Sequence, residues 1–397
     1  MRDKSPVEVL LAFLKLGLTA FGGPVAHIGY FREELVVRRR WLDDAAYAEL
    51  VALCQFLPGP ASSKVGFSLG LIRAGYWGGL AAWLGFTLPS ALFMTLFAYG
   101  ASSFGGPVGA GLVHGLKLVA VAIVAQAVWS MARTLCPDPQ RAAIGCIAAV
   151  FVLWTDSPLS QLTVIVFGAS MGLWLCRGPL QKPVGILGAP VSRPAGLAAL
   201  AAFLVFAMGL PLLRTVRSLP GAAIADAFYR SGALVFGGGH VVLPLLHDAV
   251  VTPGWVSDST FLAGYGAAQA MPGPLFTFAA YLGAEASPPP HRALGAAIAL
   301  VAIFLPGMLL LIGTLSFWDG LRSKKETQAI VRGINAAVVG LLGAALYSPV
   351  WSSAVFTAPD AGVAVVGFIL LTRWRVPPIV VVIVGAAAGM ALSRLAN

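Results

Sequence analysis

Charged residues are scarce in this chain of 397 residues, at 11%, whereas soluble domains carry about a quarter. The five histidines do not cluster, and no Gly-x-x-x-x-Gly-Lys-Ser/Thr loop for nucleotide phosphates occurs. These absences argue against a soluble enzyme, a metalloprotein and a pump with its own ATP site. We therefore expect no catalytic residue, no cofactor and no bound metal. Cysteine is equally rare and shows no Cys-x-x-Cys spacing, so we interpret the four thiols as small buried apolar groups: Cys54, Cys136, Cys146 and Cys176.

Apolar residues dominate instead, at 58% of the chain. The net charge of +10 sits in short loops, where it sets topology and attracts anionic lipid rather than nucleic acid. The composition predicts an all-α polytopic membrane protein embedded in a lipid bilayer. Several apolar stretches approach the roughly 20 residues that cross a bilayer core as a helix: 81–99, 113–128, 197–213, 293–312 and 330–346.

One pattern of residues occurs twice in the chain. The motifs Phe21-Gly22-Gly23 and Pro58-Gly59-Pro60 return in the same order as Phe236-Gly237-Gly238 and Pro272-Gly273-Pro274, with almost the same distance between them. Two copies of one hydrophobic unit, each interrupted by Gly and Pro, are typical of secondary transporters. A Trp, an Asp and a Gln stand at matching places between the motifs: Trp41, Asp44 and Gln55, then Trp255, Asp258 and Gln269.

The duplication predicts three parts: a first transmembrane repeat over 1–177, a linker and connecting helix over 178–221, and a second transmembrane repeat over 222–397. We expect five or six hydrophobic segments in each repeat, some of them re-entrant, and one extra helix at 195–213. The apolar run 7–20 is interpreted as retained structure rather than a signal peptide, because its Phe-Gly-Gly ending recurs in mid-chain. One extra crossing between the copies inverts the second relative to the first.

Basic residues change sides between matching loops of the two repeats. Arg38, Arg39 and Arg40 precede Trp41, whereas the matching stretch 250–254 has no basic residue. Under the positive-inside rule, such exchanges predict two inverted-topology repeats, with the N-terminus in the cytoplasm and the C-terminus outside. Three further loop pairs exchange their basic residues: Arg133 and Arg141 in the first half, and Arg322, Lys324, Lys325, Arg373 and Arg375 in the second. Four arginines do not fit this scheme: Arg214, Arg217, Arg292 and Arg394.

Pro-Gly-Pro inside an apolar segment breaks a helix, because proline removes an N–H donor and glycine relaxes the backbone. At membrane depth such a break is tolerated only where protein or a wet cavity surrounds it. The helix that restarts after Pro60 aims its free N–H groups at the break, which makes an anion site. Its first turn holds Ser62, Ser63 and Lys64, whose hydroxyls and ammonium can bind an oxyanion. In the alternative interpretation, Lys64 reaches an interface and the serines only cap the helix.

Further candidates for substrate binding flank the breaks. The second repeat has Thr277 and a phenylalanine where the first has Ser63 and Lys64, so the first repeat is the charged half. Gln55 and Gln269 each precede Pro-Gly-Pro by three residues and offer a side-chain amide, with helix–helix hydrogen bonding as the alternative role.

The Phe-Gly-Gly motifs predict a second pair of breaks that cross near the first, with close packing as the alternative. The histidine that follows each motif is a donor to an anion or, in the alternative, a buried core histidine. The candidate residues from these motifs are Gly22, Gly23, Gly237, Gly238, His27 and His240.

With both motifs in two ordered copies, the chain resembles the chromate transporter (CHR) family in its long, two-domain form. The resemblance covers essentially the whole chain, and Gly239 departs from it mildly where the first copy has Pro24. It implies a multi-pass protein of the prokaryotic inner membrane that exports chromate and so confers chromate resistance. Sulfate is a close analogue that nothing in the spacing distinguishes from chromate. A homodimer is left open.

Two other classes of function compete with export by a carrier. A sulfate or oxyanion transporter, or an anion channel, can be built on the same architecture; saturable exchange of anions would separate carrier from channel. A membrane enzyme that uses Cys54 to reduce chromate lacks paired cysteines and a nucleotide loop. Without an ATP site, export is driven by the membrane potential or an ion gradient, and a dianion leaving a negative-inside cell gains about 4.6 kcal/mol per 100 mV.

Overall fold

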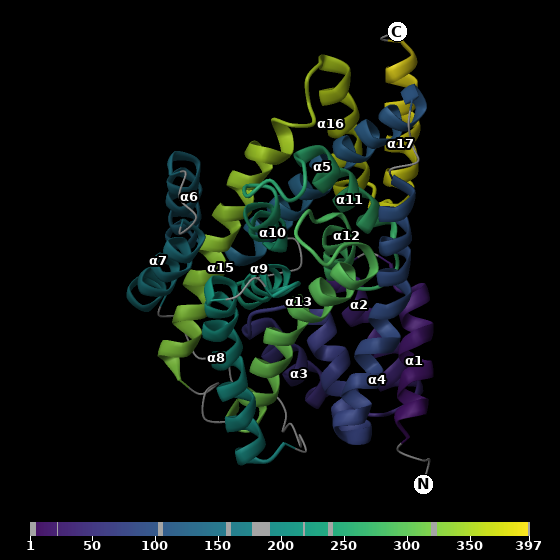
Figure 1. Cartoon of the computed structure of the whole chain (residues 1–397). Coiled ribbons are helices and arrows are strands. Elements are labelled where there is room, and N and C mark those ends of the chain that lie inside the picture. The colour runs from purple at the N-terminus through teal and green to yellow at the C-terminus, as the bar shows by residue number, and fades with distance from the viewer. Residues whose placement is uncertain are drawn as a thin grey trace.

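The structure is a computed structural model that describes residues 5–21, 23–101, 106–155, 160–176, 191–216, 219–236, 241–318 and 324–395. All regular structure in these ranges is helical (Figure 1). The first half contains α1 (Pro6–Thr19), α2 (Gly23–Phe31), the π-helix η1 (Arg32–Arg38), α3 (Asp44–Phe56), α4 (Ala61–Ala101), α5 (Gly106–Leu135), α6 (Pro139–Trp154) and α7 (Ser160–Leu175). After α8 (Arg193–Val216) come α9 (Ala222–Ala233), α10 (Val242–Val250), α11 (Asp258–Ala270), the 3₁₀ turn η3 (Leu275–Thr277), α12 (Phe278–Glu285), α13 (Arg292–Leu315), α15 (Lys325–Ala345), the π-helix η4 (Leu346–Trp351), α16 (Ala358–Thr372) and α17 (Pro378–Leu395).

Capping residues set where the helices begin. Asp43 caps α3 by accepting a hydrogen bond from the backbone N–H of Ala46 at 2.7 Å. Ser257, at the matching position of the second repeat, caps α11 in the same way through the N–H of Thr260 at 3.2 Å. Each such cap stabilises its helix by about 1 kcal/mol. The repeated sequence therefore starts the same helix in both halves.

The long helix α4 contains a sharp turn. Ala74 and Gly75 leave helical geometry, and Gly75 has a φ of +66° that favours glycine. The piece before the turn, 61–73, is too short to cross a bilayer core, which takes about 20 residues. In the second half, the short helix α12 and the long helix α13 follow one another in the same order.

Among the described residues, five helices are long and apolar enough to cross a membrane, and the turn at Ala74–Gly75 divides the first of them. The chain is therefore a multi-pass membrane protein, as its composition predicts. The five are Ala61–Gly100, Gly111–Leu135, Arg193–Arg214, Arg292–Leu315 and Lys325–Trp351.

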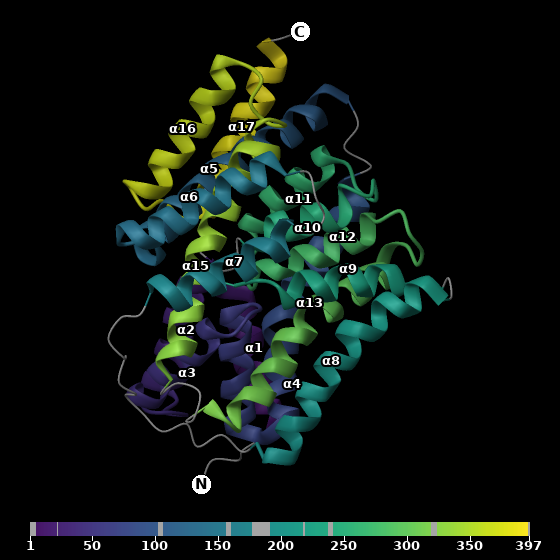
Figure 2. The same cartoon turned by 90° about the vertical axis from the view of Figure 1, so that its left-hand side faces the viewer.

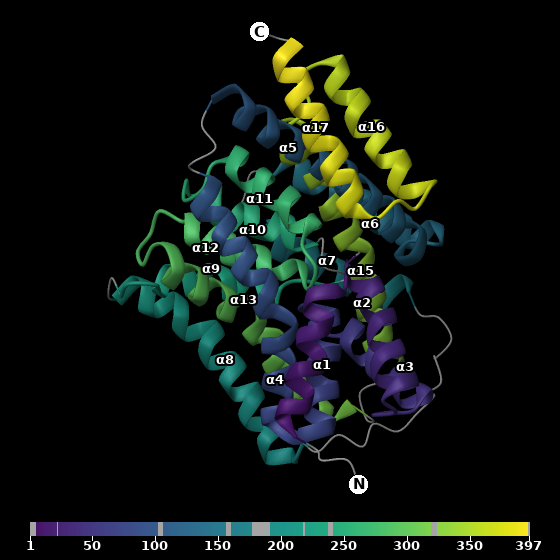
Figure 3. The same ribbon diagram turned by 90° about the vertical axis from the view of Figure 1, so that its right-hand side faces the viewer.

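Helices of each half pack against helices of the other half. The helix α5 of the first half packs against α16 and α17 of the second, and α15 of the second half packs against α6 and α7 of the first (Figures 1 and 3). Small residues permit both contacts. A Cβ at Gly389 would collide with Gly111 and Gly115 of α5, and one at Gly172 with Ala329 and Gly333 of α15.

The connecting helix predicted at 195–213 is α8, which runs along the outside of the molecule (Figure 2). Only 11% of its most apolar window is buried, although that window has the high mean hydropathy of 2.3. An apolar helix with this little protein cover needs lipid around it.

Candidate functional site

The first Pro-Gly-Pro motif separates two helices. The helix α3 ends at Phe56 and α4 begins at Ala61, so Pro58, Gly59 and Pro60 form the connection. Gly59 has a φ of +98°, a conformation that L-residues with a side chain rarely adopt. The segment lies inside the protein: Gly59 and Pro60 are both buried.

Lys64 lies in the first turn of α4 and is only 1% exposed. Its ammonium donates to the carbonyl oxygens of Leu57 at 2.5 Å and Pro58 at 2.9 Å. These carbonyls directly follow the end of α3, where the helix dipole is negative and favours a cation. The protein itself therefore supplies two acceptors for the buried ammonium, which the sequence argument did not foresee. The alternative in which Lys64 reaches an interface does not apply.

The two serines beside Lys64 differ in their partners. The Oγ atom of Ser62 lies 3.4 Å from Nδ1 of His27, whose ring is 1% exposed. The Oγ atom of Ser63 is buried and has no hydrogen-bond partner among the described residues. Both serines are 3% exposed, so this turn is closed off from the surface in this structure.

The second Pro-Gly-Pro motif has the same left-handed glycine as the first, but a 3₁₀ turn follows it and its side chains differ. The helix α11 ends at Ala270, and Gly273 has a φ of +89°. The hydroxyl of Thr277 donates to the carbonyl of Pro274 at 2.9 Å, so its bonding capacity is used locally. Phe278, at the position that matches Lys64, is fully buried.

The two glutamines take different positions. Gln55 is exposed on α3, whereas Gln269 is half-buried and its side-chain nitrogen has no partner among the described residues. Of the two, it is therefore Gln269 that has an unsatisfied donor inside the described part of the protein.

Each Pro-Gly-Pro break is hydrogen-bonded to the other half of the chain. The N–H of Gly59 donates to the carbonyl of Val235 at 2.7 Å, just before the second Phe-Gly-Gly motif. The N–H of Gly273 donates to the carbonyl of Ala20 at 2.9 Å, just before the first. Each Pro-Gly-Pro connection thus contacts the residue directly before the Phe-Gly-Gly motif of the other half, and the crossing of the breaks stays a prediction. Gly23 has a φ of +79° at the start of α2; Gly22, Gly237, Gly238 and His240 lie outside the described residues.

Ion pairs hold the π-helix η1, which follows α2 after the first Phe-Gly-Gly motif, in place. Glu34 accepts from Lys15 at 3.0 Å, Arg39 at 3.0 Å and Arg38 at 3.2 Å. Burial raises the pKa of Glu34, but these three cations outweigh it and hold the pKa below its usual range. The arginine run that indicated topology therefore also fixes the fold.

Two buried carboxylates were missed by the sequence interpretation. Glu49 of α3 is buried and accepts from the indole N–H of Trp318 at 2.9 Å. Asp226 of α9 is buried and binds Arg230 four residues on. Acidic residues inside apolar helices were the available signal, because such residues are costly in a membrane and mark functional or pairing sites.

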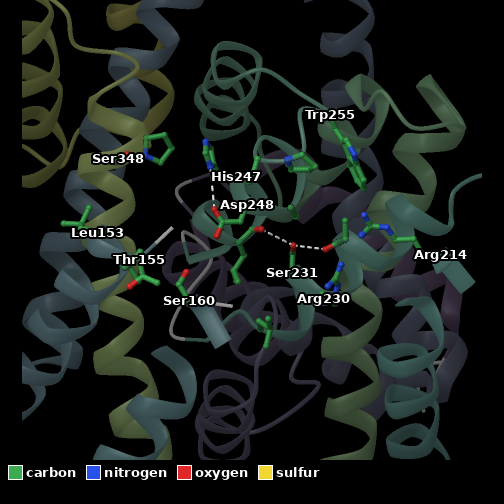
Figure 4. Close-up of a pocket in the computed structure, with 18 residues that line it drawn as sticks. Leu153, Thr155, Ser160, Arg214, Arg230, Ser231, His247, Asp248, Trp255 and Ser348 are labelled. Carbon is green, nitrogen blue, oxygen red and sulfur yellow. Dashed lines mark hydrogen bonds and ion pairs between the residues drawn. The ribbon is translucent and has the colours of Figure 1, made fainter. Parts of the chain in front are cut away.

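A cavity of 740 Å³ lies between α6, α9, α10 and η4 (Figure 4). Among the described residues, none of the substrate-site candidates predicted from the sequence lines it. Its polar wall includes two arginines, a histidine and several hydroxyls. The labelled members of that wall are Thr155, Ser160, Arg214, Arg230, Ser231, His247, Asp248 and Ser348.

Helices long and apolar enough to cross a membrane, together with a buried ammonium beside the Pro-Gly-Pro connection, describe a polytopic membrane protein. The sequence model of the chromate transporter family matches the chain in two parts, residues 7–173 and 222–390. The chain belongs to the chromate transporter family, which makes it a transporter rather than an enzyme.

Several relatives match most of this chain. A chromate transport protein of Pseudomonas aeruginosa is 29% identical over 85% of the chain and 79% of its own length. A probable chromate transport protein of Synechococcus elongatus is 27% identical over 95% of the chain and 93% of its own length. A chromate transport protein of Cupriavidus metallidurans is 27% identical over 96% and 91%. No solved structure matches.

Proposed function

We propose that this protein exports chromate across the plasma membrane of a prokaryotic cell and so gives chromate resistance. The observation that carries the proposal is that the relatives matching 85, 95 and 96% of the chain are chromate transport proteins, one of them a probable one. Chromate is a tetrahedral dianion, and its site must supply positive charge and hydrogen-bond donors without much water. The first turn of α4 offers both.

The substrate site in this proposal is the turn Ser62–Lys64. An ammonium has three N–H donors, and the carbonyls of Leu57 and Pro58 take two, so one remains for an anion. The Ser63 hydroxyl is buried and unpaired among the described residues, and it is a second donor. Charge-assisted hydrogen bonds of this kind are about twice as strong as neutral ones. The other proposed contributors are Gln55, Gln269, Thr277, His27, His240, Gly22, Gly23, Gly237 and Gly238.

We further propose that the two halves are inverted repeats and that the breaks are re-entrant. The exchanged contacts support this: Gly59 bonds to Val235, and Gly273 bonds to Ala20. The exchanged packing of α5 and α15 follows the same pattern. In inverted-repeat transporters the substrate site lies between the repeats, where such breaks meet.

The membrane potential is a sufficient driving force in this proposal. A dianion that leaves a negative-inside cell gains about 4.6 kcal/mol per 100 mV, which corresponds to more than a thousandfold concentration ratio. Export is then downhill without a coupled proton.

Uptake by inside-out vesicles at fixed potential tests the function. We expect saturable chromate uptake that grows with the potential, and weaker uptake of sulfate. Sulfate uptake with no chromate uptake would contradict the chromate assignment. Flux that never saturates would favour a channel.

The position of loop tags tests the topology. A tag after Arg40 is expected in the cytoplasm and one after Pro253 outside, because the basic residues of these matching loops are exchanged. Both tags on one side of the membrane would contradict the inverted repeats.

A further inference from the structure

The cavity between α6, α9, α10 and η4 lies close to the first break, on the other side of the end of α9. Ser231 and Leu234 line the cavity, and the residues beside them reach Gly59. The carbonyl of Val235 accepts from the Gly59 N–H at 2.7 Å, and the carbonyl of Gly232 would lie 3.8 Å from a Cβ placed on Gly59. One short stretch at the end of α9 therefore separates the cavity from the connection that precedes Lys64.

The wall of this cavity carries two guanidinium groups on one carboxylate. Arg230 and Arg214 reach the same oxygen, Oδ2 of Asp226, at 2.6 Å and 3.6 Å. Asp226 is only 1% exposed, whereas the two arginine side chains are 53% and 50% exposed. Two cations on one anion leave a net positive charge, and each guanidinium has five N–H donors, more than one shared carboxylate oxygen can use.

The other charges of the cavity lie at its opposite end. His247 pairs with Asp258 at 2.7 Å and with Asp248 at 3.8 Å, so these acids are engaged by the histidine. Figure 4 shows His247 and Asp248 apart from Arg214 and Arg230, with Ser231 between the two groups. The arginine end is therefore the positive part of the cavity.

Arg214 is also one of the four arginines that do not fit the positive-inside pattern. It lies in the last turn of the apolar helix α8, at the end that the positive-inside scheme places outside the cell. A functional anion partner explains why a cation stands there, since topology disfavours it.

We propose that Arg214 and Arg230 form an oxyanion-binding vestibule, through which the tetrahedral dianion passes on its way to or from the first break. This inference rests on the proposed function and adds a second site to it. The vestibule binds the anion through guanidinium N–H groups and the hydroxyls around them, and the break at Pro58–Pro60 separates it from the Lys64 site.

Equilibrium exchange in proteoliposomes tests the vestibule, because chromate at equal concentration meets both faces whatever the orientation of the protein. For Arg230→Gln we expect the half-saturating chromate concentration to rise about tenfold with little change in the maximal rate, since one charge-assisted hydrogen bond is lost. Arg230→Lys should recover part of the affinity because it keeps the charge. Sulfate competition should weaken in parallel in Arg230→Gln.

The matched control is Lys15→Gln. Lys15 stands at the position of the first repeat that matches Arg230, is 54% exposed and pairs with Glu34, so its loss should leave the half-saturating concentration unchanged. If Arg230→Gln does not reach the membrane, Arg214→Gln tests the same site from α8 while the Asp226–Arg230 pair is intact. A lower maximal rate at unchanged half-saturation in whichever of the two variants is produced would overturn the vestibule, because it indicates a structural role. Wild-type protein that exchanges no chromate would instead overturn the proposed function.

Discussion

At the first Pro-Gly-Pro break an ammonium occupies the protein interior, and at the second a phenyl ring does. Lys64 binds the carbonyls that directly follow the end of α3, whereas Phe278 packs in a cluster of aromatic side chains. The glycines of the two breaks are alike, since Gly59 and Gly273 have φ values of +98° and +89° and each bonds to the other half. The rings around Phe278 are Phe261, Tyr265 and Tyr281.

The difference separates two tasks that one repeated backbone can serve. A break surrounded by packed aromatic side chains has a structural role, because the rings fill the space around it. Burying an ammonium together with a hydroxyl that has no partner among the described residues costs free energy unless a ligand binds there. We therefore infer that the first break binds the substrate, whereas the second mainly stabilises the structure.

The largest expected effect is at Lys64. Lys64→Met removes the ammonium and should abolish chromate transport in vesicles while the protein still reaches the membrane. Lys64→Arg should retain part of the activity, because the charge stays but the donor geometry changes. Phe278→Leu is the control at the matching position and should lower transport only slightly. Wild-type transport by well-expressed Lys64→Met would place the site elsewhere.

The glycines of the two breaks should contribute equally to thermal stability. Gly59→Ala places a Cβ 3.0 Å from the Cα of Gly307, and Gly273→Ala places one 2.8 Å from Oγ of Ser90. Each also puts alanine in a left-handed conformation, which alone costs about 1–2 kcal/mol. We expect both variants to lower the melting temperature of the purified protein by similar amounts. A loss at only one of them would show that the two backbones are not equivalent.

The third comparison pairs two hydroxyls. Thr277→Val removes the bond to Pro274 and should lower the free energy of unfolding by about 1 kcal/mol, with a smaller loss of transport than Ser63→Ala causes. Ser63→Ala removes a hydroxyl that has no partner among the described residues, so stability should hold while transport falls about tenfold. Parallel thermal unfolding and uptake measurements decide between these outcomes. Equal loss of stability in both variants would mean that Ser63 is structural.

The helical fold and the positions of the breaks could be predicted because Gly and Pro act locally. Pro58-Gly59-Pro60 ends a helix whatever surrounds it. The long apolar stretches predict membrane-spanning helices from their composition alone. The hydrogen bonds between the two halves could not be predicted. The spacing shows that Gly59 matches Gly273, but not that Gly59 bonds to Val235. The two carbonyls that accept from Lys64 could not be predicted from the sequence either, because every residue has a backbone carbonyl.

The cavity illustrates the same limit for side chains. Asp226 and Arg230 are four residues apart on one helix, which the sequence displays as a pair. Arg214 comes from a different helix, and only the packing of α8 beside α9 brings it to the same carboxylate. Sites assembled from several helices depend on tertiary contacts that a single sequence does not encode in its local pattern.

The smallest expected effect is on the melting temperature, whose pH dependence should differ between two matching ion pairs. Arg32 pairs with Asp44 at 2.7 Å, and His247, at the position of the second repeat that matches Arg32, pairs with Asp258 at 2.7 Å. His247 lies in α10, which is too short to cross a membrane; burial lowers its pKa, but Asp248 and Asp258 outweigh burial and raise it.

A raised folded-state pKa means that the histidine pair stabilises the protein fully below the unfolded pKa of about 6.5, and that this contribution is lost as the pH rises through the folded pKa. The arginine stays charged throughout, so its pair does not change in this range. We expect the melting temperatures of wild type and His247→Gln to differ at about pH 6 and to converge toward about pH 8.5, while Arg32→Gln differs from wild type by a constant amount. All other titrating groups are common to the proteins compared and cancel in these differences. A gap between wild type and His247→Gln that does not change with pH would mean that the histidine acts by packing alone, and the two halves would then be alike in this respect.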